Sequence, residues 1–264
     1  MSKSKLVSKV DGLIVRESGQ WIVRKHFYLR RYLDIFSRGM KNRWQERTYI
    51  DLFAGPGRCV VRGTAEEFEG SPLIALQHDF TRFIFVETDK QCLADLKRRC
   101  SKSPKADRIE YWNEDCNEVA RKLRPKGLSV AFIDPVGLDF NFEALKSLSS
   151  YDPIDLLMTI PIGMDVKRNF ARYCAARDTS PLGRFLGPTA HWPSIKEAED
   201  VLPEFKRIMS TLGFGTVQHA DIPVQNDKQA LLYYLVFASR HPRGLEFWKK
   251  ISAQDEKGQM ELGL

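Results

Sequence analysis

An apolar stretch gives way abruptly to glycine and proline in the run Tyr49-Ile50-Asp51-Leu52-Phe53-Ala54-Gly55-Pro56-Gly57. The pattern predicts a buried β-strand over 48–54 that ends in a glycine-containing loop. Glycine lets a ligand approach the backbone closely and permits φ values denied to other residues. We therefore expect a ligand to rest on Gly55 and Gly57.

The loop does not match a phosphate-binding pattern. A dinucleotide site has the spacing Gly-x-Gly-x-x-Gly and passes at once into a helix whose N-terminus faces a pyrophosphate. Here position 60 is Val, and a polar stretch separates the loop from Ser71-Pro72, where a helix can begin. A ligand without phosphates is the better match.

Strands and helices alternate along the chain, which predicts an α/β fold of the Rossmann-like type. The expected strands are 48–54, 83–86, 108–112, 129–133 and 154–158, with helices near 71–79, 89–100, 116–124 and 141–149 between them. An amphipathic helix over 21–40 precedes them. Two successive strands, 214–224 and 230–238, predict a terminal antiparallel hairpin and hence one reversed strand near an edge of a mainly parallel sheet.

Two parts of the chain lie outside this alternation. Residues 1–20 are mostly polar and are expected to form a loose arm, with order beginning near Trp21. Residues 163–212 exceed the length of one crossover helix and contain several prolines and glycines, so we expect an inserted, surface-exposed substrate element. The predicted organisation is an N-terminal arm and helical extension (1–47), a main domain (48–240, with the insertion about 179–205), and a C-terminal helix and tail (241–264).

Composition limits the class of protein. With 264 residues, 43% of them hydrophobic and 28% charged, the chain can bury a sizeable core. It contains no membrane-length apolar run and no secretory leader, so we expect a cytoplasmic protein. The five cysteines include no Cys-x-x-Cys pair, so no metal is expected. The net charge of +7 favours a polyanionic partner without establishing one.

Acidic residues follow the next two strands. Glu87, beside Thr88, stands where the second strand should end, a position that normally binds ribose hydroxyls. Asp115, beside Cys116, follows the third strand and could accept a hydrogen bond from an adenine amino group, although it could equally be only a helix N-cap. Asp89 is expected to cap the following helix. Ligands in open α/β sheets bind at the carboxyl ends of the strands, where these acids would gather.

The fourth strand closes with Asp134-Pro135-Val136-Gly137. An exocyclic base amine has two protons and needs acceptors to hold it and to direct its lone pair. The Asp134 carboxylate and the Pro135 carbonyl are chemically suitable for this. The alternative is a simple Asp-Pro turn that ends a strand.

Taken in order, these motifs resemble those of class I S-adenosylmethionine-dependent methyltransferases. Within that class the chain looks most like the three-Cys-motif partner proteins, which share a first-helix pattern, the Tyr49–Gly57 run, a Gly-Ser pair and a closing segment. In this sequence those features are Trp21, Lys25, His26, Leu29, Tyr32 and Leu33; Gly70-Ser71; and His241-Pro242, Gly244 and Trp248. The resemblance covers roughly 21–252 and implies a seven-stranded Rossmann-like fold and S-adenosyl-L-methionine as cofactor.

The resemblance also implies roles for individual residues. The cofactor would contact Asp51, Phe53, Ala54, Gly55, Pro56, Gly57, Glu87, Thr88, Asp115, Cys116 and Asp134, while Asp134 and Pro135 would be catalytic. Candidate substrate contacts are Lys25, Arg24, Tyr28, Gly137, Pro161 and Arg168. Further cations that could neutralise phosphates are Arg30, Arg31, Lys167, Arg172 and Arg177, although such charge runs are more often solvated helix faces.

The acceptor is predicted from the Asp-Pro-x-Gly motif, which looks like that of tRNA guanine-N2 dimethyltransferases. Val136 replaces the usual Phe and so removes an aromatic that could stack on a base. Adenine-N6 enzymes carry (Asp/Asn)-Pro-Pro-(Tyr/Phe), from which this chain departs at two positions. We therefore expect guanine N2 first and adenine N6 second, in RNA before DNA, with a partner protein possible. The rival hypotheses are a small-molecule or protein methyltransferase, and a catalytically silent module that binds nucleic acid or protein in a phage-defence or mobile-element setting.

Overall fold

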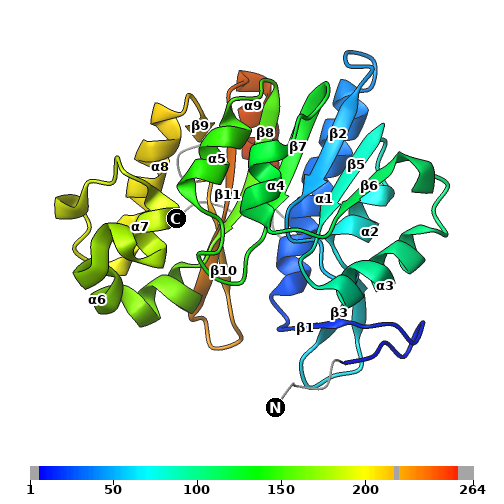
Figure 1. Ribbon diagram of the computed structural model, residues 1–264, viewed down its shortest axis with the longest axis horizontal. Coiled ribbons are helices and arrows are strands. Elements are labelled where there is room, and N and C mark those ends of the chain that lie inside the picture. Colours follow the sequence, from blue (N-terminus) through cyan, green and yellow to red (C-terminus); the bar gives the residue numbers. More distant parts are fainter. Residues whose placement is uncertain (1–5, 217–219, 255–264) are drawn as a thin grey trace.

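A mixed β-sheet covered by helices on both faces forms the body of the protein (Figure 1). The computed structural model describes residues 6–216 and 220–254. The strands follow the spatial order β10 (Ile222–Gln225), β11 (Leu231–Ser239), β8 (Ile154–Ile160), β7 (Leu128–Ile133), β2 (Arg47–Asp51), β5 (Arg82–Val86) and β6 (Ile109–Trp112), and β9 (Gly215–Thr216) also pairs with β11. Strands β6, β5, β2, β7 and β8 are parallel, and β11 runs antiparallel to β8 and β10. The Rossmann-like fold with one reversed strand near an edge is therefore confirmed.

The terminal hairpin is confirmed, but its first half differs from the prediction. The expected strand 214–224 is divided into β9 and β10, which both pair with β11, and residues 217–219 lie outside the described part of the chain. Ala238 lies opposite Thr216, and Leu235 lies opposite Ile222. The long strand β11 thus pairs with two short strands, β10 and β9, one after the other along its length.

Two hydrophobic clusters lie between the sheet and its helices, one on each face, because alternate residues of each strand face opposite sides. Tyr49 packs with α1 (Ile22–Met40), α2 (Ser71–Leu76), α3 (Lys90–Cys100) and α9 (Pro242–Ser252). Ile50 packs with the other face, which is covered by α4 (Cys116–Lys122), α5 (Phe142–Ser149), α6 (Lys167–Ala176), α7 (Pro181–Leu186) and α8 (Val201–Thr211). None of the helices in the two described ranges is long and apolar enough to cross a bilayer.

The prediction that 163–212 forms a surface-exposed element is wrong. Leu182 of α7 and Phe205 and Ile208 of α8 are completely buried in the cluster beneath the sheet. The prolines and glycines break the segment into short helices, but the apolar residues between them still face the sheet. The segment is therefore a covering layer of the fold.

The prediction of a loose arm before Trp21 is also wrong over residues 6–20. Strand β1 (Arg16–Ser18) pairs in parallel with β3 (Arg58–Val61), which pairs with β4 (Glu67–Glu69) to form a small second sheet (Figure 1). Asp11 forms an ion pair with Arg99 of α3 at 2.8 Å, and Ile14 and Val15 are buried. Residues 1–5 lie outside the described part of the chain. Local sequence could not reveal this order, because the partner strand lies far along the chain.

Candidate active site

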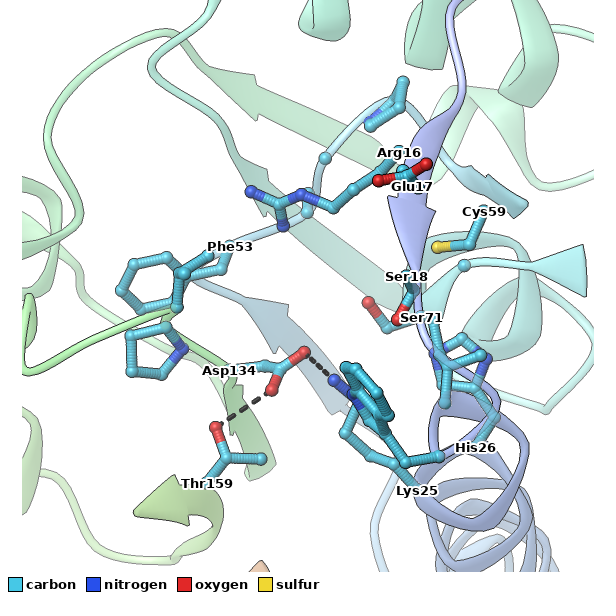
Figure 2. Close-up of a pocket in the computed structure, with 18 of the residues that line it drawn as sticks. Arg16, Glu17, Ser18, Lys25, His26, Phe53, Cys59, Ser71, Asp134 and Thr159 are labelled. Atoms are coloured by element: carbon cyan, nitrogen blue, oxygen red, sulfur yellow. Dashed lines mark hydrogen bonds and ion pairs between the residues drawn. The ribbon is translucent and has the colours of Figure 1, made fainter. Parts of the chain in front are cut away.

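Two adjoining cavities open at the carboxyl ends of the parallel strands. The first, which we name the Asp134 cavity, has a volume of about 220 Å³ and lies between β1, α1 and the ends of β2, β7 and β8 (Figure 2). The second, which we name the Glu87 cavity, has a volume of about 280 Å³ and lies at the ends of β5 and β6. Arg16, Phe53 and Val136 line both cavities, so the two are neighbours.

The glycine loop forms one wall of the Asp134 cavity. Gly55 and Gly57 have φ values of +60° and +87°, which L-residues with side chains rarely adopt. A Cβ on Gly57 would lie only 2.8 Å from Leu96 Cδ1, so this position also needs glycine for close packing. Both glycines line the cavity, and a Cβ built on Gly55 would have only Arg16 within 4 Å, which leaves space for a ligand beside Gly55.

Glu87 ties the glycine loop to the next strand. Its carboxylate accepts hydrogen bonds from the Gly55 amide at 3.0 Å and the Asp89 amide at 2.9 Å. Asp89 caps α3 through the amides of Gln91 and Cys92, as predicted. Each carboxylate oxygen has more than one lone pair, so Glu87 keeps capacity to bind hydroxyl groups in the Glu87 cavity.

Asp115 is a helix N-cap and also lines the Glu87 cavity. Its Oδ1 accepts hydrogen bonds from the Asn117 amide at 2.9 Å and the Glu118 amide at 3.4 Å, so it is the N-cap of α4. It also lines the Glu87 cavity, together with Thr88 and Cys116. An N-cap with an exposed carboxylate remains able to accept a hydrogen bond from a ligand.

Asp51 lies outside both cavities, contrary to the cofactor contact expected for it. It is completely buried and accepts hydrogen bonds from the Phe53 amide and the Tyr49 hydroxyl, both at 3.2 Å. Burial raises the pKa of Asp51 to about 7, although hydrogen bonding from Ser71 opposes the increase. Asp51 therefore supports the start of the glycine loop from behind.

The raised pKa of Asp51 predicts a stability difference that depends on pH. In the unfolded chain Asp51 loses its proton near its ordinary pKa of 3.8, whereas in the folded protein it keeps the proton up to about pH 7. Between these two pKa values the unfolded chain has released the proton and the folded protein has not. The free energy of unfolding therefore falls by about 4 kcal/mol as the pH rises from 3.8 to about 7. In urea titrations at a series of pH values, the stability of the wild type relative to Asp51→Asn should fall over this window; parallel profiles would refute the assignment.

Asp134 lies at the floor of the Asp134 cavity between two partners from different elements. Its Oδ2 forms an ion pair with the Lys25 ammonium of α1, and its Oδ1 accepts a hydrogen bond from the Thr159 hydroxyl of β8 at 2.9 Å (Figure 2). Burial acts to raise the pKa of Asp134, but the Lys25 charge outweighs it and holds the pKa below its usual value. The carboxylate is therefore ionised at neutral pH.

Tyr233, His26 and Thr159 also line this cavity but were not predicted as site residues. Tyr233 of β11 is buried, its hydroxyl has no hydrogen-bond partner within the described ranges, and the Lys25 Nζ lies 5.5 Å from the centre of its ring. Burial lowers the pKa of His26 to about 3, so its imidazole is uncharged at neutral pH. A threonine near the end of a mostly apolar strand was a usable signal for Thr159.

The structure brings most of the predicted site residues together. The Asp134 cavity is lined by Lys25, Phe53, Ala54, Gly55, Pro56, Gly57, Asp134, Pro135 and Pro161, and the Glu87 cavity by Phe53, Glu87, Thr88, Asp115 and Cys116. Besides Asp51, four predicted residues line neither cavity: Arg24, Tyr28, Gly137 and Arg168.

The residues outside the cavities have structural explanations where contacts are known. Tyr28 is completely buried and packs on Phe27 and Trp248. At Gly137 a Cβ would lie 2.8 Å from the Asp165 carboxylate, so glycine allows the loop after Asp134 to pack closely. Arg168 is exposed on α6.

Several of the cations expected to meet phosphates are paired within the chain. Arg30 forms an ion pair with Glu69 at 2.9 Å, and Lys167 forms one with Glu199 at 3.0 Å. Arg31 donates a hydrogen bond to Gln254. These side chains are therefore weaker candidates for a phosphate-binding surface than the sequence suggested.

Solved structures of other proteins share this architecture. A candidate S-adenosylmethionine-dependent methyltransferase from Listeria monocytogenes is 11% identical, with a TM-score of 0.52 over 84% of this chain and 98% of that one. A Legionella pneumophila protein is 14% identical, with a TM-score of 0.54 over 89% and 92% of the two chains. The chain has the fold of class I S-adenosylmethionine-dependent methyltransferases. No protein-family model and no curated protein matches the sequence, so the resemblance to three-Cys-motif partner proteins stays a prediction.

The two cavities lie where ligands usually bind in this type of sheet. In open α/β sheets, ligands bind outside the carboxyl ends of the strands, at the point where the strand order reverses. Here that point lies between β2 and β7, where the glycine loop and Asp134 are placed, and Glu87 follows the neighbouring strand β5. Among residues 6–216 and 220–254, no group of three or more histidine, cysteine or acidic side chains is placed to hold a metal ion.

Proposed function

We propose that the chain is an S-adenosylmethionine-dependent methyltransferase that modifies an exocyclic amine of a nucleic-acid base. RNA is preferred over DNA as the substrate, with guanine N2 as the first acceptor and adenine N6 as the second. The observation that carries the proposal is the position of Asp134, whose ionised carboxylate faces the same cavity as the backbone of Gly55 and Gly57. A cofactor on the loop and an amine on Asp134 would therefore meet.

The residues present fit this cofactor. The carboxylate of Glu87 suits the ribose hydroxyls, and Asp115 suits the adenine amino group, since both line the Glu87 cavity. Gly55 and Gly57 line the Asp134 cavity, and the absence of a side chain at Gly55 leaves room for the rest of the ligand. When bound, S-adenosylmethionine supplies an electrophilic methyl group on a sulfonium.

Asp134 would act mainly by positioning the amine. Lys25 and Thr159 each occupy one oxygen of the carboxylate, and the remaining lone pairs can accept an N–H of the substrate. Its lowered pKa makes Asp134 a hydrogen-bond acceptor and a poor base, so the proton released from the alkylated nitrogen passes to solvent. With the Pro135 carbonyl as a second acceptor, the amine lone pair would point at the methyl group.

The choice of a nucleic acid rests on charge and on the rim of the site. The chain carries a net charge of +7, which favours a polyanionic substrate. Val136, beside Pro135, is 62% exposed and lines both cavities, so an apolar side chain stands where a base would enter. The likeness of the Asp-Pro-x-Gly motif to that of guanine-N2 enzymes favours guanine N2 over adenine N6 as the acceptor.

The test is transfer of a tritiated methyl group to separated RNA, DNA and protein fractions, followed by mass spectrometry of the labelled nucleosides. We expect label in RNA and a methylated exocyclic amine. Label confined to protein, to a small molecule or to a ring carbon would contradict the proposed acceptor. Cofactor binding in calorimetry without transfer to any fraction would instead favour the catalytically silent module.

A further inference from the structure

Arg16 reaches the candidate active site from the small second sheet. Its backbone lies opposite Cys59 in the parallel pairing of β1 with β3. Its side chain extends from β1 into the pocket, toward Phe53 (Figure 2), and lines both the Asp134 and the Glu87 cavities. The arm that carries Arg16 is held by the buried side chains of Ile14 and Val15.

Arg16 differs from the other cations of the Asp134 cavity in its partners. Lys25 is paired with Asp134, Arg58 with Glu67 at 3.2 Å, and Arg62 with Glu17 at 2.8 Å. For Arg16 no ion pair or hydrogen bond from its guanidinium is found within the described residues. The cavity therefore presents one cation whose charge the described chain does not balance by direct contact.

The Arg16 guanidinium lies close to the glycine loop, so a ligand bound on the loop would contact it. A Cβ placed on Gly55 would lie 3.9 Å from Arg16 Nη1, an ordinary van der Waals distance. A ligand atom resting on the Gly55 backbone would therefore touch the guanidinium. A planar guanidinium presents parallel N–H donors that match the two oxygens of a carboxylate.

We propose that Arg16 binds the α-carboxylate of the cofactor's amino-acid end, across the glycine loop from Gly55. This inference rests on the proposed function, since it takes S-adenosylmethionine as the ligand. The sulfonium of that cofactor is itself a cation and repels a guanidinium, so we expect Arg16 to meet the cofactor through an anionic group. The carboxylate is the anionic group that the cofactor carries, and β1 would thus form part of the cofactor site.

The test compares two ligands that differ only in this carboxylate. Isothermal calorimetry is performed with S-adenosylhomocysteine and with its decarboxylated analogue, on the wild type, Arg16→Gln and Arg16→Lys. We expect Arg16→Gln to weaken binding of S-adenosylhomocysteine about tenfold and that of the analogue less than about twofold, since only one ligand loses a charge-assisted hydrogen bond. Arg16→Lys should retain part of the affinity.

Arg38→Gln is the matched control, because it removes one positive charge from the exposed face of α1 where Arg38 pairs with Asp34. It should leave both affinities unchanged. Equal losses for the two ligands, or no loss for either, would overturn the role of Arg16. A loss confined to binding of a single-stranded RNA oligonucleotide would also overturn it, by assigning Arg16 to a phosphate. Failure of the wild type to bind either nucleoside would instead reject the proposed function itself.

Discussion

Replacing Gly55 by valine should abolish binding of S-adenosylmethionine while the protein remains folded. At a φ of +60° a β-branched residue is strained, and its isopropyl group would project into the cavity beside Arg16. We expect the affinity in calorimetry to fall by more than about a hundredfold, which corresponds to about 3 kcal/mol. The far-ultraviolet circular dichroism spectrum should not change.

Gly63→Val provides the matched control for this substitution. Gly63 also has a left-handed φ, +76°, and a Cβ there meets nothing within 4 Å. The two variants therefore carry similar backbone strain, but only the one at Gly55 enters the cavity. If Gly55→Val bound the cofactor with wild-type affinity, the glycine loop would not be the cofactor site.

Replacing Asp134 by alanine should eliminate methyl transfer and leave cofactor binding nearly intact. Without the carboxylate the amine loses the acceptor that directs its lone pair, and we expect turnover to fall by about a thousandfold, or about 4 kcal/mol in activation free energy. The affinity for S-adenosylhomocysteine should change by less than about threefold, because Glu87 and the glycine loop hold the cofactor in our proposal. Single-turnover transfer and calorimetry measure the two effects separately.

Loss of the Asp134 carboxylate also leaves Lys25 without its ion-pair partner in a mostly buried position, which would destabilise the fold. Asp134→Asn avoids this ambiguity in part, since the amide oxygen can still accept the hydrogen bond from Thr159. We expect this variant to fold and to be strongly impaired. Asp34→Ala breaks an exposed ion pair with Arg38 on α1, the helix that carries Lys25, and should retain full turnover. Wild-type turnover in both Asp134 variants would remove Asp134 from the mechanism.

Much of the fold could be predicted because the elements of a parallel sheet have strong local signatures. The buried run before Gly55 and the amphipathic pattern from Trp21 to Met40 correspond to β2 and α1. Glu87 and Asp134 could be placed on one sheet edge, because the ends of parallel strands meet there. Asp89 was correctly predicted to be a helix cap, since the acidic residue directly precedes a helical pattern.

The errors share a physical cause, which is that burial depends on residues far apart in the chain. Asp51 has the residue type and position of a ligand contact, yet it is completely buried behind the loop, with a hydrogen bond from Ser71 of the later helix α2. The helices after β8 contain breakers that are typical of a surface element, yet Phe205 is buried against the sheet. Neither property follows from a local window of sequence.

The amino-acid sequence by itself determined the alternation of strands and helices, the glycine loop, and the acids that follow the strands, because each depends on backbone preferences within a few residues. Only the tertiary structure decided how the site is closed and charged. Arg16 enters the cavity through the pairing of β1 with β3, and Lys25 meets Asp134 across a separation of 109 positions. Such contacts depend on how the whole chain packs, since electrostatic partners are chosen by proximity in space and not by order in sequence.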